Sequence, residues 1–211
     1  MNDSEPLNSS APRLMSRADA VSMGVFMIAG IAIAAWTLIA ATLRIIEVLG
    51  GGALRVYAEF AGTPAEAPIG PGGAARTIEL DSGWLLTSEL PAASVAALVI
   101  EQAMLAATVL TVVGCLLALT WNILCGRMFS RANTRLVTIA GLTGIAGMFI
   151  VPFFANMAAN GAFATVSNRE FDNVILSMDL FPFILLAFIA ALASTVFGIG
   201  DRLQRETEGL I

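Results

Sequence analysis

The sequence predicts an all-α membrane protein, a bundle of four transmembrane helices with a small extracytoplasmic β-hairpin cap between helices 1 and 2. Three observations support this class. Of the 211 residues, 57% are hydrophobic and only 13% are charged, which is about half the charged share of an average soluble domain. Four uncharged runs are each long enough to cross a membrane. The segment between the first two runs changes to the period-two alternation that is typical of β-strands.

The composition also narrows the classes of function. A mean hydropathy of +0.83 excludes a soluble enzyme, a disordered chain or a nucleic-acid-binding domain, because too little polar surface remains. A net charge of −5 argues against nucleic acid as a direct partner. Histidine, the most common metal ligand and the usual proton shuttle near neutral pH, is absent. No catalytic or metal-binding constellation is evident, so we expect no enzyme activity, no metal and no cofactor.

The four uncharged runs are expected to be transmembrane helices. A helix needs about 20 residues to cross roughly 30 Å of hydrocarbon, and only a helix satisfies its own backbone hydrogen bonds there. The runs cover residues 20–43, 102–126, 136–168 and 180–200. The first run is longer than the apolar region of a cleaved signal peptide, so we interpret it as a retained span.

These spans define the expected domain organisation. We expect residues 1–19 to be a flexible cytoplasmic N-terminal tail and residues 20–211 to be a single four-helix membrane domain. The connecting segments are an outer cap at 50–94, an inner loop at 126–135, an outer loop at 160–179 and a cytoplasmic tail at 201–211.

The arginines predict the orientation of the spans. All basic residues are arginine, and loops rich in arginine stay on the cytoplasmic side. Four spans place both termini on one side, and this side holds most of the arginines. They are Arg13, Arg17, Arg127, Arg131, Arg135, Arg202 and Arg205. The sequence therefore predicts a multi-pass protein with both termini and the 126–135 loop in the cytoplasm.

The outer cap carries the signal of a β-hairpin. Hydrophobic and polar residues alternate over 53–60 and again over 75–81, and a segment rich in proline and glycine separates them. A two-stranded hairpin is only marginally stable alone. We therefore expect it to pack on the outer helix ends or on a partner, either as a structural lid or as a ligand-binding cap.

Charged residues near the outer ends of the first two spans suggest an ion pair. Arg44 ends the first run and Glu101 precedes the second, so adjacent antiparallel helices place them at similar depth. We expect a structural Arg44–Glu101 pair. Two alternatives stay open, namely a functional site that also uses Glu47 and Asp179, or unpaired side chains that extend to the interface.

Small residues recur at helical spacings in two of the runs. They are Gly141, Gly144 and Gly147 in the third run, and Gly24, Gly30 and Ala34 in the first. Small residues let helix backbones approach closely, so we interpret both sets as packing faces. Pro152 lies inside the third run, and a bend is expected near Phe149–Pro152.

The inner loop and the tail form the candidate cytoplasmic interaction surface. Gly126 is expected to end the second helix and Ser130 to cap the third, while an Arg202–Glu206 pair extends the fourth. The candidate residues are Arg127, Phe129, Arg131, Asn133, Arg135, Arg202, Leu203 and Glu206. The alternative is that the loop arginines only fix the topology and contact anionic lipid.

The same two segments resemble the signatures of a bacterial membrane family known as domain of unknown function 2975. Its members show a Gly-x-x-Phe-Ser/Thr-x-x-Asn stretch before the third span and a Phe-x-x-Gly-x-x-Leu-x-x-Glu-like tail. The matching residues here are Gly126, Phe129, Ser130 and Asn133, then Phe197, Gly200, Leu203 and Glu206. The resemblance implies the bacterial inner membrane and, as a partner, a small helix-turn-helix transcription regulator of the Cro type. It implies no catalytic residues.

The sequence therefore predicts a regulatory or sensory membrane protein whose cytoplasmic face binds a small regulator. A transporter or accessory transport subunit is one alternative, and a structural membrane assembly protein is the other. The lipid bilayer is the expected surrounding, and the oligomeric state stays open.

Overall fold

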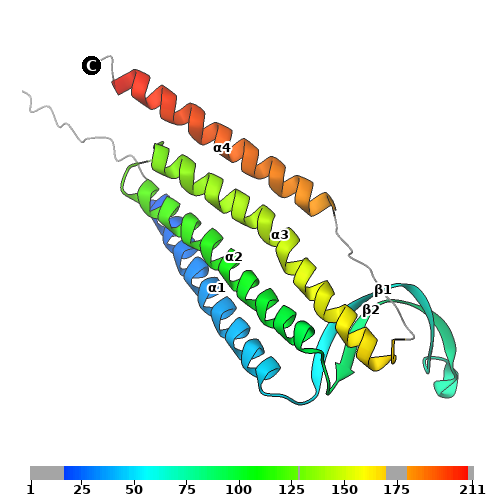
Figure 1. The fold of residues 1–211 in the computed structure, drawn as a ribbon. Helices are drawn as coiled ribbons and strands as arrows, with labels where there is room; N and C mark the ends of the chain where they lie inside the picture. Colours follow the sequence, from blue (N-terminus) through cyan, green and yellow to red (C-terminus); the bar gives the residue numbers. More distant parts are fainter. Residues whose placement is uncertain (1–16, 128, 170–179, 209–211) are drawn as a thin grey trace, which may run out of the picture.

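The computed structural model describes residues 17–127, 129–169 and 180–208. Its elements follow the order α1 (Arg17–Leu49), β1 (Leu54–Ala67), η1 (Pro71–Gly73), β2 (Arg76–Thr87), α2 (Ala92–Leu124), α3 (Arg131–Val166) and α4 (Leu180–Glu208) (Figure 1). Most of the expected N-terminal tail lies outside the described residues. Residues 170–179 of the expected outer loop also lie outside them.

Each of the four helices contains a stretch long and apolar enough to span a membrane, which confirms the four runs. α2 begins before the second uncharged run, at the point where Pro91 and Ser94 predict the start of a helix, and it ends two residues before the run does. α2 begins at Ala92, directly after Pro91, whose fixed φ of −56° suits the position before a helix. Glu101 therefore lies inside α2 and not at its start. α4 continues past its apolar stretch to Glu208, as the tail sequence predicted.

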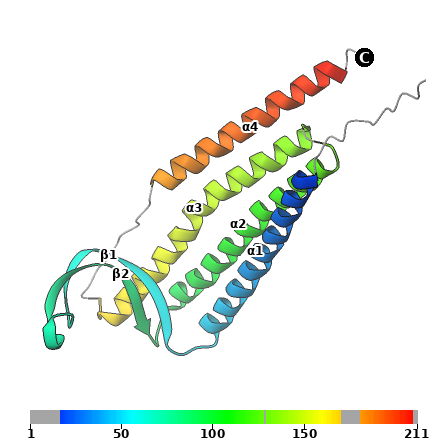
Figure 2. The same ribbon diagram turned by 180° about the vertical axis from the view of Figure 1, so that it is seen from behind.

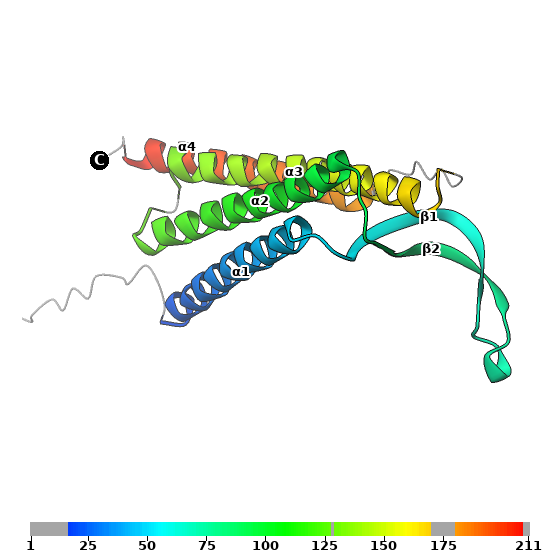
Figure 3. The same ribbon diagram turned by 60° about the horizontal axis from the view of Figure 1, so that its bottom comes forward.

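The helices stand in a row in the order of the sequence. α2 packs against α1 on one side and α3 on the other, and α4 packs against α3. Figures 1 and 3 show α1 and α4 at opposite ends of this row, and among the described residues they make no extensive contact with each other. The arrangement of the four helices is thus open, a feature that the sequence analysis did not predict.

The contact between α1 and α2 uses one of the two glycines expected there. A Cβ at Gly30 would come within 2.9 Å of Leu117 Cδ2, so glycine is what permits the close approach of α2. A Cβ at Gly24 would meet nothing within 4 Å. The predicted packing face of α1 is therefore correct at Gly30 and wrong at Gly24.

The three glycines of α3 serve two different neighbours. A Cβ at Gly141 would come within 2.7 Å of Ala190 Cβ in α4, whereas one at Gly147 would overlap Thr108 of α2. A spacing of three residues turns a helix by about 300°, so the glycine stripe rotates by roughly 60° at each step. The stripe therefore starts against α4 and ends against α2. Pro152 follows in the same helix, which changes direction along its length in Figure 1.

The hairpin is longer than the sequence predicted. β1 and β2 form a two-stranded antiparallel ribbon whose register begins at Leu54↔Thr87 and ends at Ala67↔Arg76, with one irregularity between Glu59 and Thr63. The prediction stopped the first strand before Pro64. Both strands of a two-stranded ribbon are edge strands, however, and an edge strand tolerates proline.

The buried core lies where the ribbon meets the helices. One face of the ribbon base packs against the second half of α3 and the first turns of α2, and the view from behind shows this junction (Figure 2). The rings of Phe60 and Phe163 meet edge to face there at 5.1 Å. The fully enclosed residues include Val48, Leu54, Val56, Ala58, Ala97, Leu98, Ala158, Ala159, Ala162 and Phe163. We call this the ribbon end of the molecule, and packing on helices explains how a lone hairpin is stabilised.

Candidate functional site at the corner between α2 and α3

The opposite end of the molecule is formed by the corner between α2 and α3, residues 125–130. Gly126 has a φ of +79°, a left-handed conformation that glycine adopts without strain, and it ends α2 as predicted. Ser130 caps α3, because its Oγ accepts a hydrogen bond from the backbone N–H of Asn133 at 3.2 Å. Both local predictions from the sequence are confirmed.

Asn133 holds the corner together from the inside. Its side chain is fully buried. Its Nδ2 donates to the backbone carbonyl of Arg127 at 2.6 Å, and its Oδ1 accepts from Nδ2 of Asn122 in α2 at 2.8 Å. We expected Asn133 on the interaction surface, and this was wrong. A short amide side chain one turn into α3 can satisfy the loop backbone only by pointing inward.

Phe129 connects the corner to α4. Its ring centroid lies 6.0 Å from that of Phe197, and a Cβ at Gly200 would overlap the Phe129 ring. Glycine at position 200 therefore permits the ring to seat on α4. The two short motifs of the sequence meet in this contact, although 67 residues separate the phenylalanine of one motif from that of the other.

Arginines surround this contact on the outside. Arg127, Arg131, Arg135 and Arg202 are all exposed, and Leu203 is 58% exposed beside them. The side chain of Glu206 lies outside the described residues, and so does the expected Arg202–Glu206 pair. Acidic residues are found at both ends of the molecule. Those of the ribbon and of the neighbouring parts of α1 and α2 are Glu47, Glu59, Glu66, Glu79, Asp81, Glu89 and Glu101, whereas Asp19 belongs to the start of α1 and Asp201, Glu206 and Glu208 to the end of α4.

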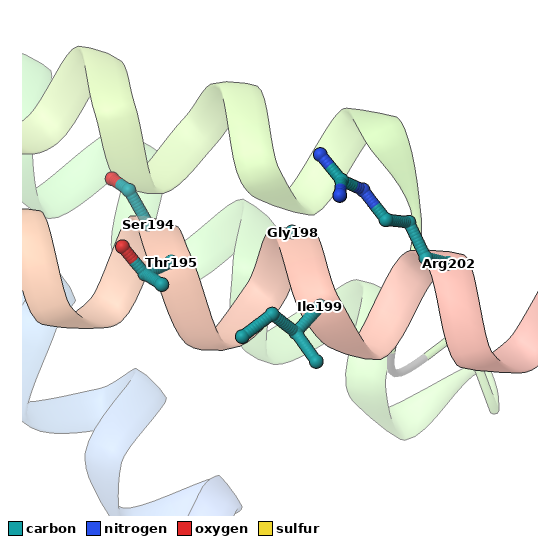
Figure 4. A pocket seen from close by; sticks show the side chains of 5 residues that line it. All are labelled: Ser194, Thr195, Gly198, Ile199 and Arg202. Carbon is teal, nitrogen blue, oxygen red and sulfur yellow. The ribbon is translucent and has the colours of Figure 1, made fainter.

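A pocket of about 400 Å³ opens beside the contact, along α4 (Figure 4). Its lining residues are Ser194, Thr195, Gly198, Ile199 and Arg202. Ser194 and Arg202 point toward α3 in Figure 4, and the Ser194 hydroxyl lies 3.4 Å from that of Thr138. The pocket thus has hydroxyl groups at one end and a guanidinium at the other. Within the described ranges, no group of histidine, cysteine or acidic side chains could hold a metal ion.

The expected ion pair at the ribbon end does not form. Arg44 Nη1 bonds Glu47 Oε2 at 2.8 Å, and its Nη2 donates to the backbone carbonyl of Arg55. Glu101 accepts a hydrogen bond from Gln102 instead, at 3.3 Å. Both terminal nitrogens of Arg44 already have partners, one on its own helix and one on the ribbon base. Asp179 lies outside the described residues.

The position of Asn122 at the inner end of the second uncharged run predicts an interhelical hydrogen bond, and its bond to Asn133 of α3 confirms this. That Asn133 is the partner was not predicted. The signal was available, since two asparagines stand on either side of a predicted turn at Gly126. The contact of Phe129 with Gly200 had no such signal, because nothing local links residues so far apart in the chain.

Comparisons with known proteins provide no relative from which a function could be inferred. No protein-family model, no curated protein and no solved structure matches the chain. The resemblance to domain of unknown function 2975 stays a prediction based on the two motifs. The function is therefore inferred from the corner, its contact with α4 and the surrounding arginines.

Proposed function

We propose that the chain is a multi-pass protein of the bacterial cytoplasmic membrane, with both termini and the α2–α3 corner in the cytoplasm and the ribbon on the other side. The exposed apolar side chains along α1 and α4 support insertion, since lipid is the solvent that such surfaces require. The arginines around the corner support the orientation. Figure 1 supports it further, because α1 begins and α4 ends at the same end of the molecule.

Membrane insertion is tested by fractionation of cells that express the full chain. An integral protein stays in the membrane pellet after a wash with alkaline carbonate and floats with lipid on a density gradient. Recovery of the chain in the supernatant without detergent would overturn the proposal.

We further propose a regulatory or sensory role, in which the corner and the end of α4 form a docking surface for a small helix-turn-helix regulator. The observation that carries this is the seating of Phe129 on Phe197 and Gly200. It joins the loop and the tail into one surface. The resemblance suggests the class of partner, and the geometry supports this end of the molecule as the proposed docking position.

The corner is suited to docking because it combines a fixed backbone with free cationic side chains. The Asn133 hydrogen bonds fix the loop, while Arg127, Arg131 and Arg135 extend from it into solvent. Side chains on a preorganised backbone lose less entropy on binding than those on a mobile loop. Among the described helices, α4 makes its extensive contacts with α3, and its end rests on Phe129 of the corner, so a partner at this surface has a direct route to changing the position of α4.

The docking role is tested with the full chain in nanodiscs, which expose both membrane faces, and a purified small helix-turn-helix regulator of the Cro type. We expect the regulator to bind the wild type and to lose at least about tenfold in affinity for R127Q/R131Q/R135Q, since three contact charges are removed. R76Q is the matched control, because Arg76 is an exposed arginine of the ribbon end. Absence of binding to the wild type would refute the docking role, and so would equal loss of affinity in R76Q.

A further inference from the structure

The face of the ribbon base that points away from the helices carries an unusual set of side chains. The register pairs Arg55 with Leu86 and Tyr57 with Trp84. Directly paired residues of an antiparallel ribbon lie on the same face, and so does the pair two positions further along the strands. All four side chains therefore lie on one face, and the opposite face of the same strands belongs to the buried core.

These four residues, which we call the aromatic patch, are exposed although three of them are large and mainly apolar. Trp84 is 57% exposed, Tyr57 47% and Leu86 68%. The rings of Tyr57 and Trp84 meet edge to face at 5.4 Å, and the guanidinium carbon of Arg55 lies 5.3 Å from the Trp84 ring centroid. Tryptophan and tyrosine concentrate at the membrane–water interface, and arginine is suited to phosphate.

The position of the patch agrees with that chemistry. Arg44 of α1 donates a hydrogen bond to the backbone carbonyl of Arg55, which fixes the ribbon base at the end of this helix. Tyr57 lies two residues further along the strand, or about 7 Å. The headgroup layer extends roughly 5–7 Å beyond the hydrocarbon on each side. Ile46 and Leu49, in the last turns of α1, are exposed too, so the apolar surface of this helix continues to the end that binds the ribbon base.

We propose that the aromatic patch is an interfacial anchor that lies in the phospholipid headgroup layer on the ribbon side of the membrane. Trp84, Tyr57 and Leu86 enter the layer, and Arg55 binds a lipid phosphate. Lipid is the occupant because the patch continues the lipid-facing surface of α1 and presents a cation to an anionic layer. The inference rests on the proposed membrane insertion. It adds the position of the ribbon base relative to the lipid headgroups.

The three tryptophans of the chain allow a test in which the two proposals fail separately. Trp36 lies near the middle of the apolar stretch Val21–Leu49, and Trp121 lies three residues before the end of α2. Two variants of the full chain, W36F/W121F and W84F/W121F, each retain a single tryptophan at one depth. Both are reconstituted in vesicles whose phospholipids carry bromine either close to the headgroup or near the chain ends, and fluorescence quenching is measured.

We expect Trp84 to be quenched at least about twofold more strongly by the shallow bromine than by the deep one, as for an interfacial tryptophan. Trp36 should show the reverse order. If Trp36 follows this order and Trp84 is quenched by neither lipid, the interfacial anchor is refuted and membrane insertion stands. If neither bromine position quenches Trp36, membrane insertion itself is wrong.

The role of Arg55 is tested in the variant that retains only Trp84. R55E places a negative charge against the lipid phosphates, so shallow quenching of Trp84 should fall by about half or more. R76E is the matched control, because Arg76 is exposed at the far end of β2 and should leave the quenching unchanged. Unchanged quenching in R55E would remove Arg55 from the anchor, and an equal fall in R76E would mean that general charge is responsible.

Discussion

Replacement of Asn133 by alanine tests the organisation of the corner. The side chain is fully buried, its Nδ2 donates to the carbonyl of Arg127, and its Oδ1 accepts from the amide of Asn122. Asn133→Ala removes the hydrogen-bond partner of the Arg127 carbonyl and of the Asn122 amide, and solvent has little access to the position of the lost side chain. The backbone N–H of residue 133 still donates to Ser130, so the cap of α3 is retained.

The expected cost follows from these two bonds. A net hydrogen bond contributes about 1 kcal/mol, and a buried group left without a partner costs about 1–3 kcal/mol. We therefore expect N133A to lower the free energy of unfolding by about 2–4 kcal/mol. Asn122→Ala breaks only the bond between the two amides, so it should cost about 1–2 kcal/mol. Since the two residues share that bond, the double variant should cost about 1 kcal/mol less than the sum.

The assay is unfolding of the full chain in mixed micelles with increasing dodecyl sulfate, followed by far-ultraviolet circular dichroism. N156A is the matched control, because Asn156 is a half-buried asparagine of α3 for which the described residues provide no side-chain partner. A transition of N133A that coincides with that of N156A would refute the reasoning. Strict additivity in the double variant would show that the two amides act independently.

Four further predictions concern the contacts of α4 and the charged residues at the ribbon end. Gly200→Ala places a Cβ in the Phe129 ring, so we expect it to destabilise the chain by about 1–3 kcal/mol in the same assay; an unchanged transition would show that α4 does not rest on Phe129. T138C/S194C, made in the C115A/C125A background, should form a disulfide under mild oxidation because the native hydroxyls lie 3.4 Å apart, and failure to cross-link on non-reducing gels would contradict the contact of α3 with α4. Glu47→Gln should cost less than about 0.5 kcal/mol, as for an exposed ion pair. Glu101→Gln should cost nothing, since Arg44 keeps its partners, and a larger loss for E101Q than for E47Q would restore the Arg44–Glu101 pair.

The sequence predicts the elements of this fold better than their arrangement. Uncharged runs locate the four helices because a membrane-spanning helix must exclude charge along most of its length. They do not locate the start of α2, since Glu101 interrupts the run while the helix continues through it. The arrangement of the helices in an open row could not be predicted from the sequence either. In a helix that is apolar on all sides, the pattern does not tell which face meets another helix and which meets lipid.

In the candidate site, too, the features set by neighbouring residues were predictable, whereas those set by tertiary packing were not. Gly126 and Ser130 were predictable because helix caps depend on neighbouring residues alone. The inward direction of Asn133 depends on the loop that it supports. The contact of Phe129 with Gly200 depends on the packing of α4 against α3. The predicted Arg44–Glu101 salt bridge does not form because Arg44 binds Glu47 and the backbone carbonyl of Arg55, and the contact with the ribbon depends on tertiary packing.

The most direct measurement of the central claim is the side of the membrane on which each end of the molecule lies. In the C115A/C125A background, Arg76→Cys places a thiol on the ribbon and Arg131→Cys places one beside the corner, and both positions are exposed. A maleimide that cannot cross the membrane should label R76C in intact cells and should label R131C only after the cells are opened. Labelling of R131C in intact cells, with R76C protected until lysis, would contradict the account.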